Sequence, residues 1–317
     1  TCLYGKANTH GYQILTGWAY YLLGLAAYIG NDMQKACQYF QQAVNMRYLI
    51  SKTIVREAYV GLCLAQQAAG NITAVETNLN QLDDLEGFEI NEYQRSLRAR
   101  LAMNGCHLQQ AQSWQLKDPF TLPACLFAWL ELPHFTQARL WVKDGRPEEL
   151  VNAVDLLGDL IPLAEKMGSI WRMIEGKVWL ACALYRQMKQ QQACQVMDEA
   201  VRLAMPRSFY RLFIEAGPLA AEILNRLECR NTAFVKQILA DLQSDRTIQV
   251  EHPLLTNREL EVLRLLNQHL SEREIAGCLS VSLDTVKKHC YHIYNKLGVN
   301  NRREALAAAR QNGLILS

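Results

Sequence analysis

The sequence predicts an all-α protein in which a solenoid of helical repeats precedes a small four-helix domain. Apolar residues recur at helical spacing along most of the 317 residues, and no convincing strand-like alternation occurs. Turn sequences such as Gly-Asn and Gly-Arg-Pro separate these stretches. The length is sufficient for two or more domains, each with its own core. We expect a repeat domain at 1–242, a polar linker at 243–253 and a second domain at 254–317.

A degenerate pattern of paired helices recurs in the first part of the chain. Small residues stand where two helices would cross and a large residue follows to fill the gap, as Phe40 follows Gly24. This spacing is typical of a tetratricopeptide repeat, and it occurs at 20–43, 59–82, 180–200 and, more loosely, 97–111. Such pairs cannot bury their apolar faces singly. We therefore expect them to stack into a solenoid with an extended inner surface.

Residues 117–141 interrupt the repeats and are rich in proline and aromatic residues. Such a segment forms either a joint between two solenoid halves or a ligand-binding wall, and we favour the joint. Aromatic faces also stack on flat ligands, but large aromatics usually serve packing first. We therefore expect gap filling from the six tryptophans, at 18, 114, 129, 141, 171 and 179.

The second domain marks its helix starts with capping sequences. In a capping box, a side-chain oxygen and a carboxylate bind free amides at a helix N-terminus. Two such boxes and one Asn-led variant occur, at Thr256-x-x-Glu259, Ser271-x-x-Glu274 and Asn301-x-x-Glu304. A further helix is expected to begin after Ser282, a good N-cap, and to end at Gly298.

The longest of these helices has two distinct faces. At 100° per residue one face is apolar, and its members are Val286, Cys290, Ile293 and Leu297. The opposite face is polar and carries Asp284, Lys288, Tyr291, His292 and Asn295. A short helix, a tight turn and a longer helix with an exposed basic face are typical of a helix-turn-helix that places its recognition helix in a DNA major groove.

The sequence of this segment resembles the LuxR-type C-terminal domain. The resemblance rests on T-x-R-E-x-E-V-L at 256–263, E-I-A at 274–276, T-V-K-x-H at 285–289 and K-L-G-V at 296–299. The stretches at 138–150 and 211–219 are similar to the helical domain that precedes the LuxR-type domain in MalT-like regulators. The fold class expected is thus a tetratricopeptide-like solenoid followed by a four-helix LuxR-type helix-turn-helix domain.

This resemblance implies a transcription regulator whose helical domain receives a signal and controls self-association. We expect four kinds of partner: promoter DNA, RNA polymerase, a small-molecule inducer or regulatory protein, and further copies of the chain on DNA. Regulators of this kind normally carry an ATPase module, but no Gly-x-x-x-x-Gly-Lys-Ser/Thr phosphate loop occurs here. The chain begins at Thr1 rather than Met, so we expect it to be part of a longer protein. We expect no cofactor in the chain itself, and we expect ATP to bind only to a module upstream of it.

Candidate DNA contacts follow from the exposed face of the recognition helix. Lys288 has the reach for a guanine edge or a phosphate, and Lys287 lies on the flank nearer the backbone. Thr285 is placed to donate its hydroxyl to phosphate. The other candidates are Tyr291 and Asn295 on the same face, the helix N-termini at Ser271 and Ser282, and Arg302, which alternatively pairs with Glu259 or Glu261.

Charge and cysteine content agree with a DNA-binding protein of the bacterial cytoplasm. The net charge is +2, but residues 253–317 carry nine basic and six acidic residues, which leaves the remainder at −1. Ten cysteines without a Cys-x-x-Cys pair predict reduced, mostly buried thiols. Neither a signal peptide nor an apolar span of about eighteen residues occurs, so no membrane partner is expected.

Other functions have less support in the sequence. His289 and His292 have metal-like spacing, but nothing completes a ligand set, and no catalytic constellation predicts an enzyme. A helical-repeat scaffold with a degenerate, non-DNA-binding C-terminal domain stays open as an alternative, supported only by Glu272 and Tyr291, where the sequence departs from the LuxR-type pattern. A phosphorylation-controlled response regulator would need an α/β receiver, which the helical N-terminal region lacks.

Overall fold

The protein folds into two helical units, which comprise residues 1–243 and 244–317. The computed structural model describes residues 13–86, 91–105, 108–123, 130–251, 257–268, 270–279, 281–297, 299 and 301–311. Within these ranges the regular elements are helices, and no strand occurs among them. This agrees with the predicted all-α class. No helix in these ranges is long and apolar enough to cross a membrane.

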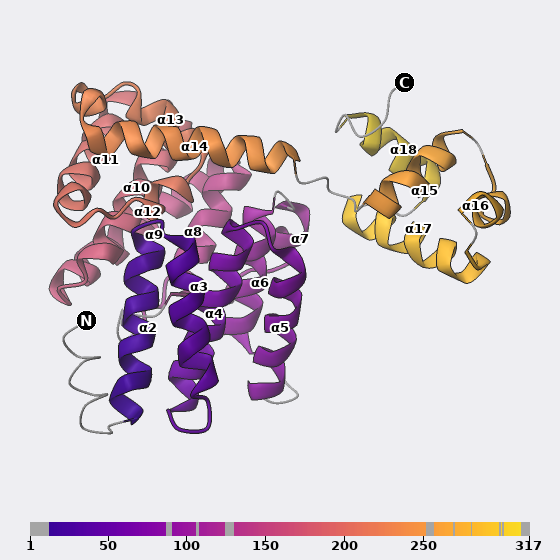
Figure 1. Cartoon of the computed structure of the whole chain (residues 1–317). Coiled ribbons are helices and arrows are strands. Elements are labelled where there is room, and N and C mark those ends of the chain that lie inside the picture. Colours follow the sequence, from indigo (N-terminus) through magenta and orange to yellow (C-terminus); the bar gives the residue numbers. More distant parts are fainter. Residues whose placement is uncertain are drawn as a thin grey trace. The chain divides into compact units, whose positions relative to one another are not determined.

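Unit 1 is built from successive helix pairs, of which Figure 1 shows α2 to α5 as adjacent upright ribbons. The paired helices are α2 (Gln13–Ile29) with α3 (Met33–Asn45), α4 (Lys52–Ala68) with α5 (Ile72–Glu86), α6 (Glu92–Asn104) with α7 (Leu108–Gln112), α8 (Pro133–Asp144) with α9 (Pro147–Lys166), and α10 (Ile170–Arg186) with α11 (Gln190–Ala204). The short α12 (Arg211–Ile214) and α13 (Pro218–Leu224) follow, and α14 (Ala233–Glu251) ends the series. The expected repeats thus appear as helix pairs.

Close helix crossings explain why small residues recur in the repeats. The ring of Phe40 fills the space beside Gly24 and Gly61, and a Cβ atom at either glycine would lie 2.6 Å and 2.5 Å from that ring. Real Cβ atoms essentially never come so close. Phe40 is itself fully buried. The predicted arrangement of a small residue at the crossing and a large one in the gap is therefore present in the first pair, and Phe40 also packs against the next helix, α4.

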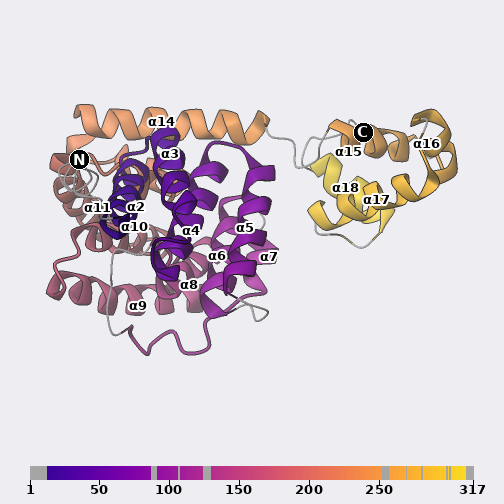
Figure 2. The same ribbon diagram turned by 60° about the horizontal axis from the view of Figure 1, so that its bottom comes forward.

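The inner side of the repeats is closed, which differs from the extended open surface that we expected. Helix α2 contacts α12, and the Tyr28 hydroxyl donates to Glu215 at 2.5 Å. The side-chain amide of Asn31 donates to Asp241 of α14 at 3.0 Å. Both views show α14 crossing unit 1 at the end where α2 and α3 join (Figure 2). The first repeat is therefore tied to the last helices of the unit.

A buried network of arginines and glutamates fills this closed interior. Glu215 accepts two hydrogen bonds of 3.0 Å from Arg100 and lies 3.2 Å from Arg139. Arg139 also pairs with Glu175, which lies 2.5 Å from Arg172. All five side chains are buried. Each carboxylate holds at least two guanidinium groups from different parts of the unit, so the network crosslinks the repeats.

The interrupting segment predicted at 117–141 is only partly irregular in its described part, because residues 133–141 belong to α8. Between α7 and α8, residues 113–123 and 130–132 contain no helix. Trp114, Trp141 and Trp179 are buried, as the gap-filling prediction requires. Trp18 and Trp171 pack against the main core while partly exposed. Trp129 lies outside the described residues.

The segment predicted as a linker is helical as far as Glu251, because α14 continues through it. The division between the units falls after Gln243, inside that helix. Leu242, just before the division, is buried. A helix satisfies its own backbone hydrogen bonds, so a polar composition is compatible with its continuation. A polar composition therefore did not mark the end of the helix.

From Asn257 onward, the described residues of unit 2 form four helices around a separate core. They are α15 (Asn257–Asn267), α16 (Glu272–Leu279), α17 (Leu283–Leu297) and α18 (Arg302–Gln311). The predicted apolar faces meet in this core, whose fully buried members include Val262, Leu263, Ile275, Val286 and Ile293. The sequence predicted this architecture of four helices with their own core.

Candidate nucleic-acid interface

The capping box at Ser271 starts the first helix of the predicted helix-turn-helix. The amide and the hydroxyl of Ser271 each donate to Oε2 of Glu274 at 2.7 Å, and the Glu274 amide donates back to Ser271 Oγ at 3.4 Å. These hydrogen bonds, with that of the hydroxyl the strongest, lower the pKa of Glu274. The box is therefore confirmed, and it occupies the Ser271 side chain.

The turn between α16 and α17 is tight and ends in a second cap. The amide of Val281 donates to the carbonyl oxygen of Ala276 at 3.1 Å. The Thr285 amide donates to Ser282 Oγ at 3.1 Å, and the two hydroxyls lie 2.8 Å apart. The predicted start of the recognition helix is confirmed. Asn301 likewise accepts from the Glu304 amide at 3.0 Å, whereas Thr256 lies outside the described residues.

Helix α17 separates its core face from its exposed face as its sequence predicts. Val286, Cys290 and Ile293 are buried in the unit 2 core. Lys287 and Lys288 are exposed, and 64% of Tyr291 is accessible to solvent. A large, exposed aromatic side chain next to two lysines is available for contact with a partner.

The two lysines carry uncompensated charge. Within the described part of unit 2, neither the Lys287 nor the Lys288 ammonium forms an ion pair. The ring of Tyr291 lies beside that of His292, with 6.0 Å between the centroids. Thr285 is half-buried at the flank of the same helix, and the Asn295 side chain lies outside the described part. The arrangement presents positive charge and hydrogen-bond donors on one helix face.

Arg302, a candidate phosphate contact, points into unit 2 instead. Its terminal nitrogens donate to the carbonyl oxygens of Leu270 at 2.9 Å and Leu266 at 2.5 Å. The carbonyls at the end of a helix lack intrahelical donors and attract a cation. Both hydrogen bonds go to backbone carbonyls, so neither is the alternative pairing with Glu259 or Glu261. Arg302 therefore joins α18 to the end of α15, and we leave it out of the interface.

Sequence reasoning missed a second arginine that holds the helices together. Arg258 donates to the carbonyl oxygen of Leu279 at 2.9 Å and to Glu261 at 2.8 Å. It thus fixes the end of α16, next to the turn that precedes α17. The Leu279 carbonyl lies at the end of a helix and therefore needs a donor from elsewhere. The sequence pattern does not show which residue supplies that donor.

Within the described residues of this unit, the cysteine and histidine side chains are not gathered into a metal-ligand set. Burial raises the pKa of the Cys290 thiol to about 11, so it packs as a neutral apolar group. The described residues hold no group of three His, Cys, Asp or Glu side chains suited to a metal ion. The cysteines in the described ranges are free thiols.

A helical-repeat unit followed by a helix-turn-helix unit with an exposed basic helix is the architecture of DNA-binding transcription regulators. Family comparison agrees for both units. Residues 6–230 match the MalT-like TPR region, and residues 253–309 match the luxR family of bacterial regulatory proteins. The chain therefore belongs to the family with the MalT-like TPR region and carries a luxR-family C-terminal domain.

The individual relatives are named as transcription regulators. The HTH-type transcriptional regulator MalT of Serratia proteamaculans is 28% identical over 62% of this chain and 26% of its own length. MalT of Klebsiella pneumoniae is 25% identical over 77% of the chain and 30% of its length. The CsgBAC operon transcriptional regulatory protein of Escherichia coli is 44% identical over 20% of the chain and 29% of its length. The chain thus spans less than a third of the length of these MalT relatives.

Proposed function

We propose that unit 2 binds duplex promoter DNA with α17 in the major groove. The observation that carries this proposal is the exposed face of α17, on which Lys287, Lys288 and Tyr291 lie opposite the buried Val286 and Ile293. The two ammonium groups supply attraction to phosphate, which dominates affinity for DNA. An α-helix fits the width of the major groove.

Each side chain on this face has a role in the proposal. Lys288 reaches a guanine edge or a phosphate, and Lys287 contacts the backbone. Thr285 donates its hydroxyl to phosphate. Tyr291 and Asn295 contact bases or sugars, and we expect Tyr291 to set the base preference of this protein.

The helix N-termini contribute through their backbone rather than their side chains. The Ser271 and Ser282 hydroxyls are engaged in caps, whereas the first amides of α16 and α17 have no intrahelical acceptor. Such amides bind phosphate favourably. The Ser271 and Ser282 positions therefore stay in the proposed interface as sources of amide donors.

Unit 1 is the proposed receiver of a signal that controls promoter binding. A small-molecule inducer or a regulatory protein would bind it, and RNA polymerase would be contacted at the promoter. A single helix-turn-helix unit makes few contacts, so tight binding is reached when several copies occupy repeated half-sites. The relatives named HTH-type transcriptional regulator MalT, which match 62% and 77% of the chain, support a role in transcription regulation.

The experiment is a duplex selection followed by affinity measurement. Full chain would select sites from a randomised duplex pool, and fluorescence anisotropy would then give affinity at several salt concentrations. The expected result is binding that weakens steeply with salt, with most of it lost in Lys287→Ala/Lys288→Ala. Arg264→Ala removes an exposed charge of α15 and serves as the control that keeps binding. A folded chain that selects no sequence and binds no duplex at low salt would contradict the proposal and favour a scaffold.

A further inference from the structure

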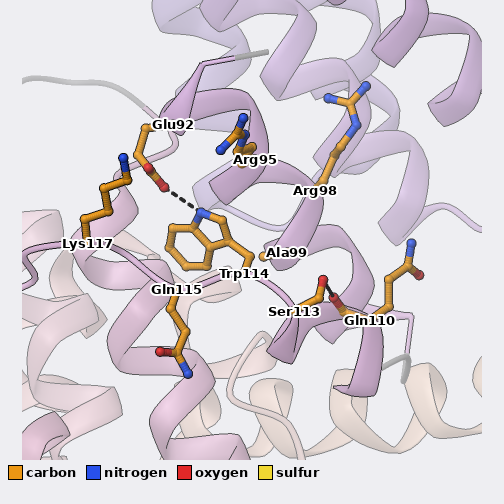
Figure 3. A pocket seen from close by; sticks show the side chains of 9 residues that line it. All are labelled: Glu92, Arg95, Arg98, Ala99, Gln110, Ser113, Trp114, Gln115 and Lys117. Carbon is orange, nitrogen blue, oxygen red and sulfur yellow. Dashed lines mark hydrogen bonds between the residues drawn. The ribbon is translucent and has the colours of Figure 1, made fainter.

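A pocket of about 420 Å³ lies in unit 1 between α6, α7 and residues 113–117 (Figure 3). Small-molecule sites usually measure about 300–1,000 Å³. Figure 3 shows the Trp114 indole in the middle of the pocket, with Lys117 on one side and Arg98 on the other. The pocket is separate from the buried Arg–Glu network, because no residue of that network lines it.

Positive charge dominates this pocket. Its lining includes three cations, Arg95, Arg98 and Lys117, and one carboxylate, Glu92. Glu92 accepts a hydrogen bond of 2.6 Å from Trp114 Nε1, and Arg98 pairs with Asp83 at 2.5 Å.

Two of these cations lack a carboxylate. In the part of the chain that the structure describes, neither Arg95 nor Lys117 forms an ion pair or a side-chain hydrogen bond. The buried Nη1 of Arg98 also lacks a hydrogen-bond partner there. Two exposed cations from different elements, Arg95 and Lys117, therefore face one pocket, and their two positive charges match a doubly charged anion.

A second cavity nearby provides a contrast. It measures about 280 Å³ and contains Arg146, Asp144 and Glu149. Arg146 pairs with Asp144 at 2.7 Å and with Glu149 at 2.8 Å, so its charge is already compensated. The uncompensated charge is thus a property of the first pocket and not of this region of unit 1 in general.

The remaining lining suits a polar organic group. Trp114 is 8% exposed and is held in place by Glu92, so its indole forms a fixed apolar floor. Gln110 and Gln115 lie at the pocket and carry amides, which donate to and accept from hydroxyl groups. Apolar ring faces next to amides are a common way to hold a sugar ring.

We propose that this pocket binds a phosphorylated small molecule of sugar size. The phosphomonoester, which carries a charge near −2 at pH 7, lies between Arg95 and Lys117. The organic part lies against Trp114. If the ligand is also the signal that controls DNA binding, that role rests on the proposed function. Its binding to unit 1 is independent of the proposed function.

The test is isothermal titration of the full chain without DNA, at constant ionic strength, with glucose 6-phosphate, inorganic phosphate and glucose as probes. We expect saturable binding of glucose 6-phosphate, weaker binding of phosphate and none of glucose. Arg95→Gln/Lys117→Gln should weaken glucose 6-phosphate binding about tenfold or more, because two charge-assisted contacts are lost. Lys166→Gln/Lys236→Gln removes two exposed charges elsewhere on unit 1 and should leave binding unchanged.

Three results would overturn the proposal: no saturable binding of glucose 6-phosphate at millimolar concentration, equal binding by the two double variants, or equal affinity for phosphate and glucose 6-phosphate. Far-UV circular dichroism checks that both double variants are folded. Because DNA is absent, failure here leaves the α17 proposal standing. Conversely, loss of DNA binding in the α17 variants does not bear on whether unit 1 binds glucose 6-phosphate.

Discussion

Glu57 shows how burial sets the chemistry of a single residue. It is fully buried on α4 and accepts a hydrogen bond from the Leu130 amide at 3.0 Å and another from the Tyr93 hydroxyl. Burial raises the pKa of Glu57 from 4.5 to about 7, against the hydrogen bond from Tyr93 and the charge of Arg56. Glu215, by contrast, touches three guanidinium groups that hold its pKa far below the usual range despite burial.

We predict that Glu57 makes unit 1 less stable as pH rises from about 4.5 to 7. The unfolded chain ionises this carboxyl near its ordinary pKa of 4.5, whereas the folded protein keeps it neutral up to about 7. The stabilisation is therefore full below pH 4.5 and decreases across this interval, by on the order of 3 kcal/mol. Glu57→Gln should remove this decrease, because an amide does not titrate.

Urea unfolding at pH 5 and pH 8, followed by tryptophan fluorescence, measures this effect. Exposed Glu222→Gln is the matched control and should keep the wild-type pH dependence. Any constant cost of placing an amide next to the Leu130 amide cancels in the comparison between the two pH values. An unchanged pH dependence in Glu57→Gln would show that Glu57 is ionised in the folded protein at pH 5.

At the scale of elements, capping sequences predicted helix starts well because a cap acts within a few residues. Ser271, Ser282 and Asn301 all form the expected hydrogen bonds. Contacts between elements could not be predicted in this way. Arg302 bonds to carbonyls 32 and 36 residues earlier in the chain, and the position of such a partner depends on how the helices pack.

We predict that Arg302→Ala lowers the free energy of unfolding of unit 2 by about 2 kcal/mol, because the carbonyls of Leu266 in α15 and Leu270 in the turn before α16 lose a charged donor. Exposed Arg303→Ala is the control, with an effect within about 0.5 kcal/mol. Urea unfolding followed by circular dichroism gives both values. An Arg302→Ala variant that is as stable as Arg303→Ala but has lost affinity for duplex DNA would return Arg302 to the interface.

At the scale of the whole molecule, the two units have separate cores. The sequence predicted this division and the repeat pairs, because helical periodicity and small residues at crossings are local signals. It did not predict the closed interior. Arg100, Arg139 and Glu215 lie on elements far apart in the chain, and isolated charged residues in a helical pattern normally predict a solvated face.

We predict that the two units unfold independently. All six tryptophans lie before residue 180, in unit 1, so tryptophan fluorescence reports that unit while circular dichroism reports both. Ile293→Ala leaves a cavity in the unit 2 core and should lower one dichroism transition by about 2–5 kcal/mol without moving the fluorescence transition. Phe40→Ala should move the fluorescence transition instead. A fluorescence shift in Ile293→Ala would mean that the units are energetically coupled.

The central claim is that the exposed face of α17 contacts duplex DNA, and amide chemical shifts of a 244–317 fragment test it most directly. During titration with a selected duplex at low salt, we predict the largest shifts at the start of α16 and along 282–292, with small shifts in the core-facing Val262 and Leu263. Lys288→Ala should reduce the shifts along α17 while the free spectrum stays folded. Shifts confined to α15 or α18, or a folded fragment whose spectrum does not change with duplex, would contradict the account.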